Sequence, residues 1–287
     1  MSRPYRTDGD GWVDCTCGQR HWGRYGAAGL MLVDDGRVLM QHRAAWSHQG
    51  GTWALPGGAR SSTETALAAA LREASEEAAV TPDAVRPSHS WVEDHGPWSY
   101  TTVVGTLERP VVARPSDPES VEIRWVARDE VADRPLHPAF AVAWPRMRMQ
   151  AGRRLVLVVD AANVVGSRPD GWWRDRAGAA ARLRDSLVLL AERGVPASAF
   201  ALPADRWWPD VRMVVEGKAR GVGSAVGVRV LAASRDGDAL IVDEVSRAAI
   251  EHPADHVVAT TADRALRSRL ETAGATVVGP RTLLDLI

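Results

Sequence analysis

Cysteine, lysine and long hydrophobic runs are scarce in this chain of 287 residues. It has only two cysteines, Cys15 and Cys17, which excludes a fold held together by a framework of disulfides. The formal net charge of −1 argues against a global electrostatic field that would attract nucleic acid or an acidic membrane surface. No run approaches the roughly 20 apolar residues of a membrane helix, and the polar N-terminus lacks a signal-peptide pattern. We therefore expect a cytoplasmic protein with no membrane partner.

The basic residues are almost all arginine, because Lys218 is the only lysine among 35 basic side chains. Together with abundant alanine, this bias is typical of a GC-rich bacterial genome. The length suggests two domains, and a hydrophobic content of 45% can support two cores. The segment 145–154, PRMRMQAGRR, loses hydrophobic periodicity and gains arginine. We therefore predict a linker there, between a domain at 1–147 and a domain at 153–287.

Three glutamates lie close together in the segment 58–80, GARSSTETALAAALREASEEAAV. If the chain is helical from about Thr65 onward, Glu73, Glu76 and Glu77 stand at i, i+3 and i+4 and project from one face. The apolar side chains of this helix cluster away from that face, as expected for a core: Leu67, Leu71, Ala74 and Ala78. Oxygen ligands at this density suit Mg²⁺ or Mn²⁺. The spacing predicts a divalent metal site, with a solvated acidic helix face as the alternative.

Two neighbouring features complete this predicted site. Arg72 lies between the two faces of the helix and can orient a carboxylate through a forked, charge-assisted pair. Before the helix, Pro56, Gly57 and Gly58 allow a sharp turn, and an exposed carbonyl there, that of Gly58, is a further candidate metal ligand.

The whole pattern resembles the Nudix box, which the chain fills in register with Gly58, Glu64, Arg72, Glu73, Ala74, Glu76, Glu77 and Val80. Ala79 departs from it, because the family has glycine where the helix ends with positive φ, at a cost of about 1 kcal/mol. The resemblance implies an α/β/α sandwich with a mixed sheet and a hydrolase that cleaves a nucleoside diphosphate linked to another group. It further implies that Glu73 activates a water bound to Mg²⁺, that Glu76 and Glu77 hold the metal, and that Arg72 orients Glu73.

The rest of the first half reads as strands around this helix. Apolar runs on either side of Asp35-Gly36 predict a β-hairpin, and residues 100–108 and 121–127 read as further strands. Glu119 lies in a loop just before the last of these strands. It is a candidate extra metal ligand or water-activating group, and a loop carboxylate in water is the alternative.

Cys15, Cys17 and His21 could supply three zinc ligands, in the segment CTCGQRH. A zinc site of this type needs four ligands, and the chain has no second cysteine pair. Two reduced, partly buried thiols are therefore the preferred interpretation, with a metal site as the alternative.

The second half alternates apolar strands with helices. Residues 155–160 form a continuous apolar run that ends in Asp160, and a helix is predicted at 176–193. Further predicted strands are 197–202, 211–215, 226–232, 256–260 and 276–278. This alternation predicts a parallel sheet with helices on both faces.

Three aspartates follow strands of that predicted sheet: Asp160, Asp238 and Asp263. At the carboxyl ends of parallel strands they can converge on a divalent metal that supports phosphodiester hydrolysis. The alternative is that Asp238 and Asp263 are only helix N-caps.

This half resembles the PIN-like, NYN family of ribonuclease-type domains through the segments 158–165, 237–245 and 260–280. The resemblance implies that Asp160, Asp238 and Asp263 bind metal beside Asn163, and that RNA is a possible partner. Ala239 stands where a second acidic residue often follows, which weakens the expectation of full activity.

The chain is therefore predicted to be a bacterial two-domain hydrolase that uses Mg²⁺ or Mn²⁺. Its substrate class is a nucleotide, a nucleotide sugar, a dinucleotide or an RNA end. In the alternative prediction, the second half is an RNA-processing nuclease, and the first half trims the 5′ end or binds a nucleotide without turnover.

Overall fold

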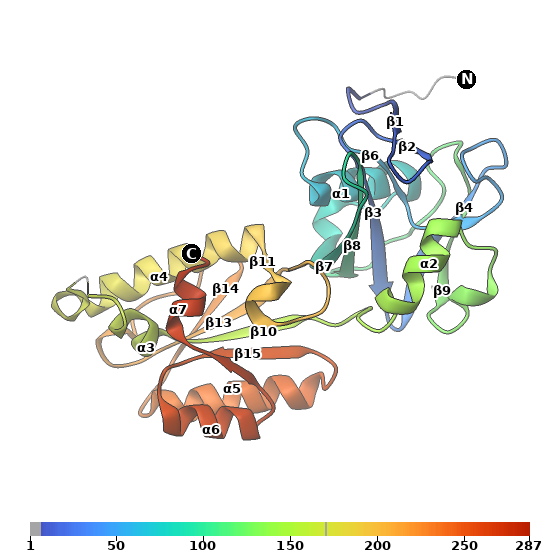
Figure 1. Cartoon of the computed structure of the whole chain (residues 1–287). Helices are drawn as coiled ribbons and strands as arrows, with labels where there is room; N and C mark the ends of the chain where they lie inside the picture. The colour runs from blue at the N-terminus through green and yellow to red at the C-terminus, as the bar shows by residue number, and fades with distance from the viewer. Residues whose placement is uncertain (1–6, 170) are drawn as a thin grey trace. The chain divides into compact units, whose positions relative to one another are not determined.

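The computed structural model describes residues 7–169 and 171–287, and the chain divides into two compact units, Met1–Gly152 and Arg153–Ile287 (Figure 1). The segment predicted as a linker is helical over its first three residues, because the helix that precedes it continues through Pro145 to Met147. The two units are described separately below.

The first unit contains a mixed sheet of seven strands. Its strands are β3 (Ala27–Asp34), β4 (Arg37–Arg43), β5 (Trp53–Ala54), β6 (Gly57–Ala59), β7 (Val85–Asp94), β8 (Ser99–Leu107) and β9 (Ser120–Ala127). Within this unit the order is β7-β8-β3-β4-β5, while β6 pairs with β3 and β9 pairs with β4. Strands β3 and β8 run parallel, whereas β3 with β4 or β6, β4 with β5 or β9, and β7 with β8 run antiparallel, so the predicted mixed sheet is confirmed. The predicted hairpin is also confirmed, with positive φ at both Asp35 and Gly36.

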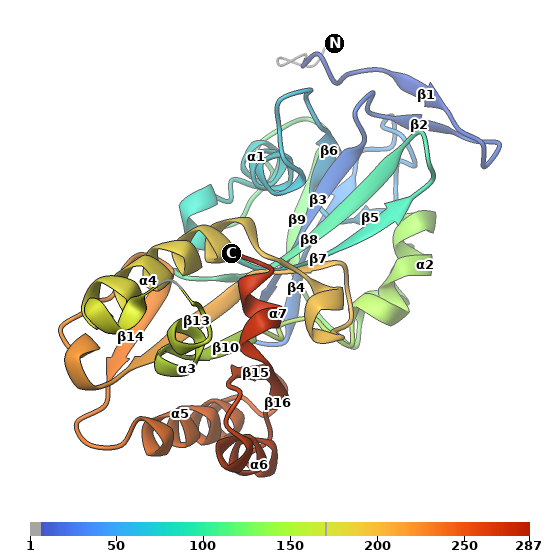
Figure 2. The same ribbon diagram turned by 60° about the vertical axis from the view of Figure 1, so that its left-hand side comes forward.

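Helices α1 (Ala66–Ala78) and α2 (Pro138–Met147) cover opposite faces of this sheet (Figure 2). Alternation along β3 divides its side chains between them. Leu30 and Leu32 pack in the cluster that contains the alanines of α1, whereas Met31 and Val33 pack with residues of α2. The unit is therefore an α/β/α sandwich, as the family resemblance implied.

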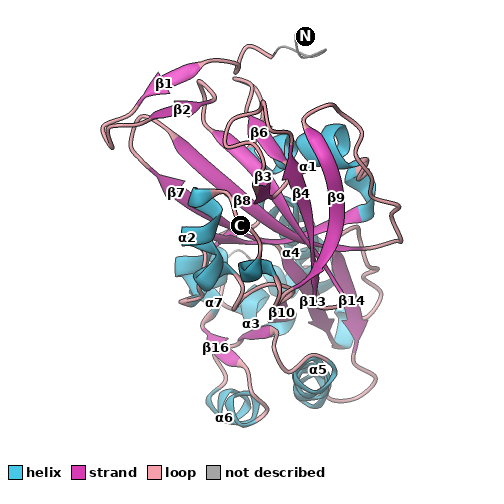
Figure 3. Ribbon diagram, turned by 90° about the vertical axis from the view of Figure 1, so that its right-hand side faces the viewer, coloured by secondary structure: helices cyan, strands magenta, loops and turns pink. Residues whose placement is uncertain are grey.

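Several elements of the first unit were not predicted. Strand β7 contains Pro87 and several polar residues, and α2 has Pro145 inside it, so neither shows a regular hydrophobic period. A short hairpin, β1 (Trp12–Asp14) and β2 (Arg20–Trp22), lies at one end of the sheet (Figure 3). Two 3₁₀ turns complete the unit, at Pro82–Ala84 and Val131–Asp133.

The second unit contains a parallel sheet of five strands in the order β14-β13-β10-β15-β16. The strands are β10 (Leu155–Asp160), β13 (Pro209–Val215), β14 (Val228–Ala232), β15 (His256–Thr260) and β16 (Thr276–Val278). Helices α3 (Ala161–Gly166), α4 (Arg176–Arg193) and α7 (Pro280–Leu284) pack on one face, and α5 (Gly237–Glu251) and α6 (Arg264–Thr272) on the other (Figure 1). This parallel architecture agrees with the predicted one, and membership of the PIN-like family stays a prediction.

The prediction of a strand at 197–202 is wrong. Residues Ala197–Phe200 form a 3₁₀ turn in which Phe200 is buried in the core. This turn lies between two short antiparallel strands, β11 (Val195–Pro196) and β12 (Arg206–Trp207). The remaining 3₁₀ turns of the unit are Trp172–Arg174 and Gly217–Ala219. Within the two described ranges of the chain, no helix is long and apolar enough to cross a membrane.

Candidate active site

Helix α1 carries the acidic side chains, and a specific residue ends it at each terminus. Thr65 caps its N-terminus, where its hydroxyl accepts a hydrogen bond from the Ala68 amide at 3.1 Å. At the other end Ala79 adopts the left-handed conformation, with φ 56° and ψ 31°. The helix therefore ends at the position where the family has glycine, without a shift in register.

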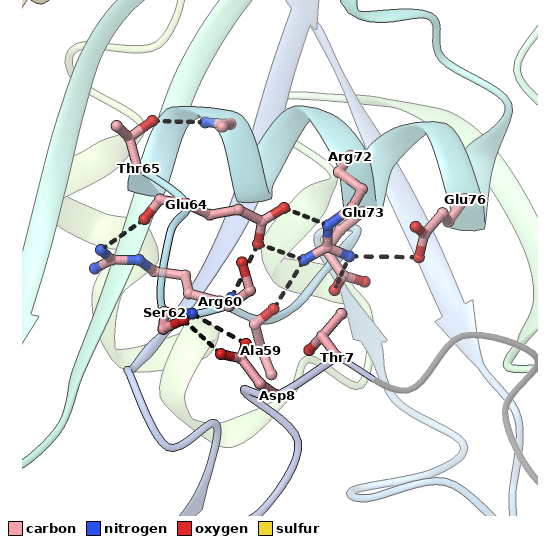
Figure 4. Close-up of polar contacts among 12 residues, drawn as sticks. Thr7, Asp8, Ala59, Arg60, Ser62, Glu64, Thr65, Arg72, Glu73 and Glu76 are labelled. Atoms are coloured by element: carbon pink, nitrogen blue, oxygen red, sulfur yellow. Dashed lines mark hydrogen bonds and ion pairs between the residues drawn. The ribbon is translucent and has the colours of Figure 1, made fainter.

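Arg72 connects four groups of this site (Figure 4). Its Nε and Nη2 donate to the two carboxylate oxygens of Glu64 at 2.7 and 3.0 Å, and Nη2 also donates to the Ala59 carbonyl at 2.9 Å. Its Nη1 donates to Glu73 at 2.8 Å and to Glu76 at 3.4 Å. The hydrogen bonds from Arg72 hold the pKa of Glu64 below its ordinary value. Arg72 thus joins the loop before α1 to the acidic face and orients Glu73.

Gly58 lies directly against the Glu73 side chain. A Cβ built on Gly58 would lie 2.5 Å from Glu73 Oε1, closer than any real contact. Glycine is required here because the loop backbone and the carboxylate approach each other closely. The role of the Gly58 carbonyl as a metal ligand stays a prediction.

Glu77 is the most deeply buried carboxylate of the site, with only 1% of its surface exposed. Its Oε2 accepts a hydrogen bond from the Gly57 amide at 2.8 Å, whereas Oε1 has no hydrogen-bond partner within residues 7–169 and 171–287. Burial, followed by the nearby charge of Glu73, raises the pKa of Glu77 well above its ordinary value. A buried carboxylate oxygen without a partner is costly unless a cation binds it.

Two further carboxylates lie beside Glu77. Ligand oxygens of Glu77, Asp117 and Glu119 all lie within 4.8 Å of one another. Three hard oxygen donors this close together, one of them from the buried Glu77, fit a divalent cation such as Mg²⁺ or Mn²⁺. The structure therefore brings Glu119 to the acidic helix, whereas Glu73 and Glu76 are not members of this tight group.

Asp117 was not singled out in the sequence, although it stands in the acidic segment that contains Glu119. Its side chain accepts hydrogen bonds from the Ser120 amide at 3.1 Å and hydroxyl at 2.9 Å. The Ser120 hydroxyl also lies 3.2 Å from the Glu77 carbonyl oxygen. Ser120 thus holds the loop carboxylate beside the end of α1.

Arg43, at the end of β4, is a cation near Glu77, and sequence reasoning missed it. Its Nε donates to the His48 carbonyl at 3.1 Å, and its Nη1 donates to Gln41 at 3.3 Å. Gln41 in turn donates to Ser120 at 2.9 Å. Burial mainly raises the pKa of Glu77, and the charge of Arg43 partly offsets that rise. No motif in the sequence marks this arginine, because its place depends on the pairing of β4 with β9.

The second unit has an acidic pocket of about 270 Å³ at the carboxyl ends of its strands. Its lining includes the three predicted aspartates, their predicted neighbour Asn163 and one acid that sequence reasoning missed: Asp160, Asp238, Asp263, Asn163 and Glu216. Glu216 directly follows β13, a position of the same kind as the others. Burial raises the pKa of Asp160, and two hydrogen bonds, from the Asn163 amide and the Thr261 hydroxyl, oppose that rise.

Helix capping explains only part of this acidic set. Asp263 caps α6 through the Leu266 amide at 2.8 Å and also lines the pocket, so its metal-binding role stays a prediction. The cap of α5 is Asp236, so the interpretation of Asp238 as a helix cap is wrong. In the part of the chain that the structure describes, the three aspartates do not form a group within 4.8 Å.

The first unit therefore combines an α/β/α sandwich with a carboxylate site suited to a divalent cation and a phosphate substrate. The family model of the NUDIX domain matches residues 23–147. A protein of Mycobacterium tuberculosis named "Putative 8-oxo-dGTP diphosphatase 3" is 51% identical over 158 residues, which are 51% of this chain and 72% of that protein. The chain belongs to the Nudix hydrolase family, whose members act on phosphoric anhydride bonds.

Two other similar proteins carry the same family name. A "Nucleoside triphosphate pyrophosphatase/Nudix hydrolase fusion protein" of Bifidobacterium longum is 49% identical over 148 residues, which are 48% of this chain. The chain spans only 30% of the length of that fusion protein. The crystal structure of the Nudix hydrolase RenU from M. smegmatis has 49% identity and a TM-score of 0.45, and the match covers 49% of this chain and 93% of RenU.

Proposed function

We propose that the first unit is a Mg²⁺- or Mn²⁺-dependent pyrophosphohydrolase that cleaves the diphosphate of a nucleoside diphosphate linked to another group. The observation that carries the proposal is the buried Glu77 carboxylate, which lies beside Asp117 and Glu119 and has one oxygen without a hydrogen-bond partner among the described residues. An oxidised purine nucleoside triphosphate is the first substrate to test, because the M. tuberculosis relative bears the name of an 8-oxo-dGTP diphosphatase. A nucleotide sugar, a dinucleotide and a capped RNA end complete the set.

The protein's own residues divide the chemistry between them. When bound, a divalent cation held by Glu77, Asp117 and Glu119, with Glu76 and the Gly58 carbonyl as further candidates, lowers the pKa of water and offsets phosphate charge. Without such a cation these carboxylates would repel a polyphosphate.

Glu73 is the proposed general base, which accepts a proton from the attacking water at its carboxylate. Arg72 keeps that carboxylate in one position through its 2.8 Å hydrogen bond. Arg43, whose charge acts on Glu77, is a proposed phosphate-binding cation.

Substitution of Glu77 tests this proposal. Glu77→Gln keeps the shape of the side chain and its hydrogen bond from Gly57 but removes the negative charge. We expect it to abolish Mg²⁺-dependent hydrolysis of every substrate in the panel, measured by chromatographic separation of the nucleotide products. Asp160→Asn in the second unit is the matched control and keeps the wild-type rate. Hydrolysis by Glu77→Gln at the wild-type rate contradicts the proposed mechanism.

A second candidate activity, supported by the acidic pocket of the second unit, is metal-dependent cleavage of RNA. Four carboxylates line this pocket, one at the end of β10 and one each in the chain that follows β13, β14 and β15: Asp160, Glu216, Asp238 and Asp263. In that case the first unit trims the 5′ end of the same RNA or binds a nucleotide as a sensor. Asp160→Asn is expected to abolish cleavage of a labelled RNA, while Glu77→Gln retains it. An Asp160→Asn protein that cleaves RNA as fast as the wild type rules out this candidate.

A further inference from the structure

A cluster of cysteine and histidine side chains lies in the first unit, apart from the carboxylate site. Ligand atoms of Cys15, Cys17, His21 and His95 all lie within 4.8 Å of one another. Cys17 Sγ and His21 Nε2 are 3.2 Å apart. The sequence showed only three of these residues together, and the fold supplies the fourth from the turn between β7 and β8.

The hairpin β1–β2 places the two thiols and His21 on the same side of a tight loop. The Cys15 amide donates to the Gln19 carbonyl at 3.0 Å, and the Gly18 amide donates back to the Cys15 carbonyl at 3.0 Å. Gly18 has a φ of 82°, which a residue with a side chain rarely adopts. This closed loop turns the chain back so that Cys15, Cys17 and His21 face one point.

The two imidazoles are held in place by neighbouring aromatic and backbone groups. The His21 ring stacks on Trp98 with 4.1 Å between centroids and 11° between planes. Trp98 is fixed in turn by a 3.1 Å hydrogen bond from its indole to the Trp22 carbonyl. The His95 amide donates to the Trp98 carbonyl at 2.9 Å, which defines the turn that presents the His95 ring. The histidine positions are therefore set before any ligand binds.

We propose that Cys15, Cys17, His21 and His95 form a structural zinc site. Two thiolates and two imidazoles are the donors of tetrahedral Zn²⁺ sites, and they are poor ligands for Mg²⁺. Tetrahedral Zn–S and Zn–N bonds place neighbouring ligand atoms roughly 3.3–3.8 Å apart, so a cluster already within 4.8 Å needs only small side-chain movements. All four positions come from the protein, which makes the site closed and structural.

The proposed zinc site lies next to a segment that contacts the loop before α1. The segment just before β1 reaches the loop that precedes α1, where Asp8 accepts a hydrogen bond from the Ser62 amide at 3.1 Å (Figure 4). The same segment is held by hydrogen bonds from Gly23 to Gly11 and from Arg24 to Gly9, both 2.8 Å. A zinc ion would link the β1–β2 hairpin to the β7–β8 turn. It would thereby keep the segment before β1 against the loop that precedes α1.

Metal analysis of the full chain, purified with reduced thiols and without chelator, tests the proposal. We expect one zinc per chain, and cobalt exchanged for zinc should give the intense visible bands and thiolate charge-transfer bands of a tetrahedral site. Cys17→Ser and His95→Ala are expected to weaken zinc binding by about 100-fold or more, since they remove direct ligands. The carboxylate variant Glu77→Gln is the matched control and retains the zinc and the cobalt spectrum.

Two results overturn the proposal. One is a reduced wild-type protein that shows no thiolate-to-cobalt band on titration, a measurement that needs no variant to fold. The other is zinc that persists in the Cys17→Ser and His95→Ala proteins but is lost from Glu77→Gln, because the metal would then belong to the carboxylates. A chelator is also expected to lower the melting temperature of the wild type and to leave that of Cys17→Ser unchanged.

Discussion

Replacement of Gly58 by alanine tests how closely the loop before α1 must approach Glu73. The new Cβ would lie 2.5 Å from Glu73 Oε1 and 2.6 Å from its Cδ. A carbon in ordinary contact lies about 3.5 Å from its neighbour, so the carboxylate or the loop must move by about 1 Å. Glu73 cannot move freely, because Arg72 binds it and also binds the loop at the Ala59 carbonyl.

The expected effect is larger on catalysis than on folding. A displacement of about 1 Å at a catalytic group can lower the rate by about 100-fold. Overpacking of this kind costs about 1–3 kcal/mol of folding free energy. We therefore expect Gly58→Ala to fold and to lose about 100-fold in kcat on the best substrate of the panel, measured at saturating Mg²⁺.

Gly36→Ala is the matched control for a loss of stability alone. Gly36 has a φ of 71° and open space around its Cα, so alanine strains the turn by about 1–2 kcal/mol without touching the site. It is expected to lower the melting temperature and leave kcat unchanged. If Gly58→Ala keeps the wild-type kcat, the close approach of this loop to Glu73 has no catalytic importance and the reasoning is refuted.

Three other substitutions have defined expected outcomes. Ala79→Gly removes the strain of a left-handed alanine and should raise the free energy of unfolding by about 0.5–1 kcal/mol in calorimetry. Ala68→Gly, in the same helix, is the control and should lower it by up to about 1 kcal/mol. An unchanged free energy of unfolding in Ala79→Gly would show that Ala79 is not strained. Arg43→Gln should lower kcat/KM about 10- to 100-fold in steady-state kinetics through loss of a charge-assisted phosphate contact, and an unchanged value would exclude that contact.

The third substitution, at His137, concerns the dependence of stability on pH. Burial, and then the charges of Arg43 and His48, lower the pKa of His137 to about 4. The neutral ring is favoured in the folded state, so stability falls as pH drops from about 6.5 toward 4, by about 1–2 kcal/mol after allowance for partial exposure. His137→Gln should flatten this part of the stability curve in denaturant titrations, and an unchanged slope would contradict the assignment.

Local elements were predictable because their causes are local. The helix at Arg176–Arg193 was located well, since its many alanines and leucines and the following Gly194 all lie within one segment. The hairpin at Asp35-Gly36 was located for the same reason. The strand expected at 197–202 was wrong because a short apolar run does not distinguish a strand from a buried turn. Strand β7 was missed because it contains Pro87 and several polar residues, which interrupt the alternation of apolar and polar side chains typical of a strand.

The candidate active site was predicted in part. The spacing within one helix was enough to place Glu73, Glu76 and Glu77 on α1 and Arg72 beside them, since helix geometry converts sequence spacing into direction. It was not enough to show that Arg72 binds Glu73 and Glu76 while Glu77 turns toward a loop. Those contacts depend on side chains from other elements.

By itself, the sequence determined the helix that carries the acids, the alternation that gives each sheet two buried faces, and the residue types available for chemistry. Only the tertiary structure decided which of them meet. Asp117 reaches Glu77 because β9 pairs with β4, and His95 reaches Cys15 and Cys17 because the β7–β8 turn lies beside the β1–β2 hairpin. The physical reason is that periodicity and propensity act over a few residues, whereas convergence of ligands depends on strand register and loop closure between residues far apart in the chain.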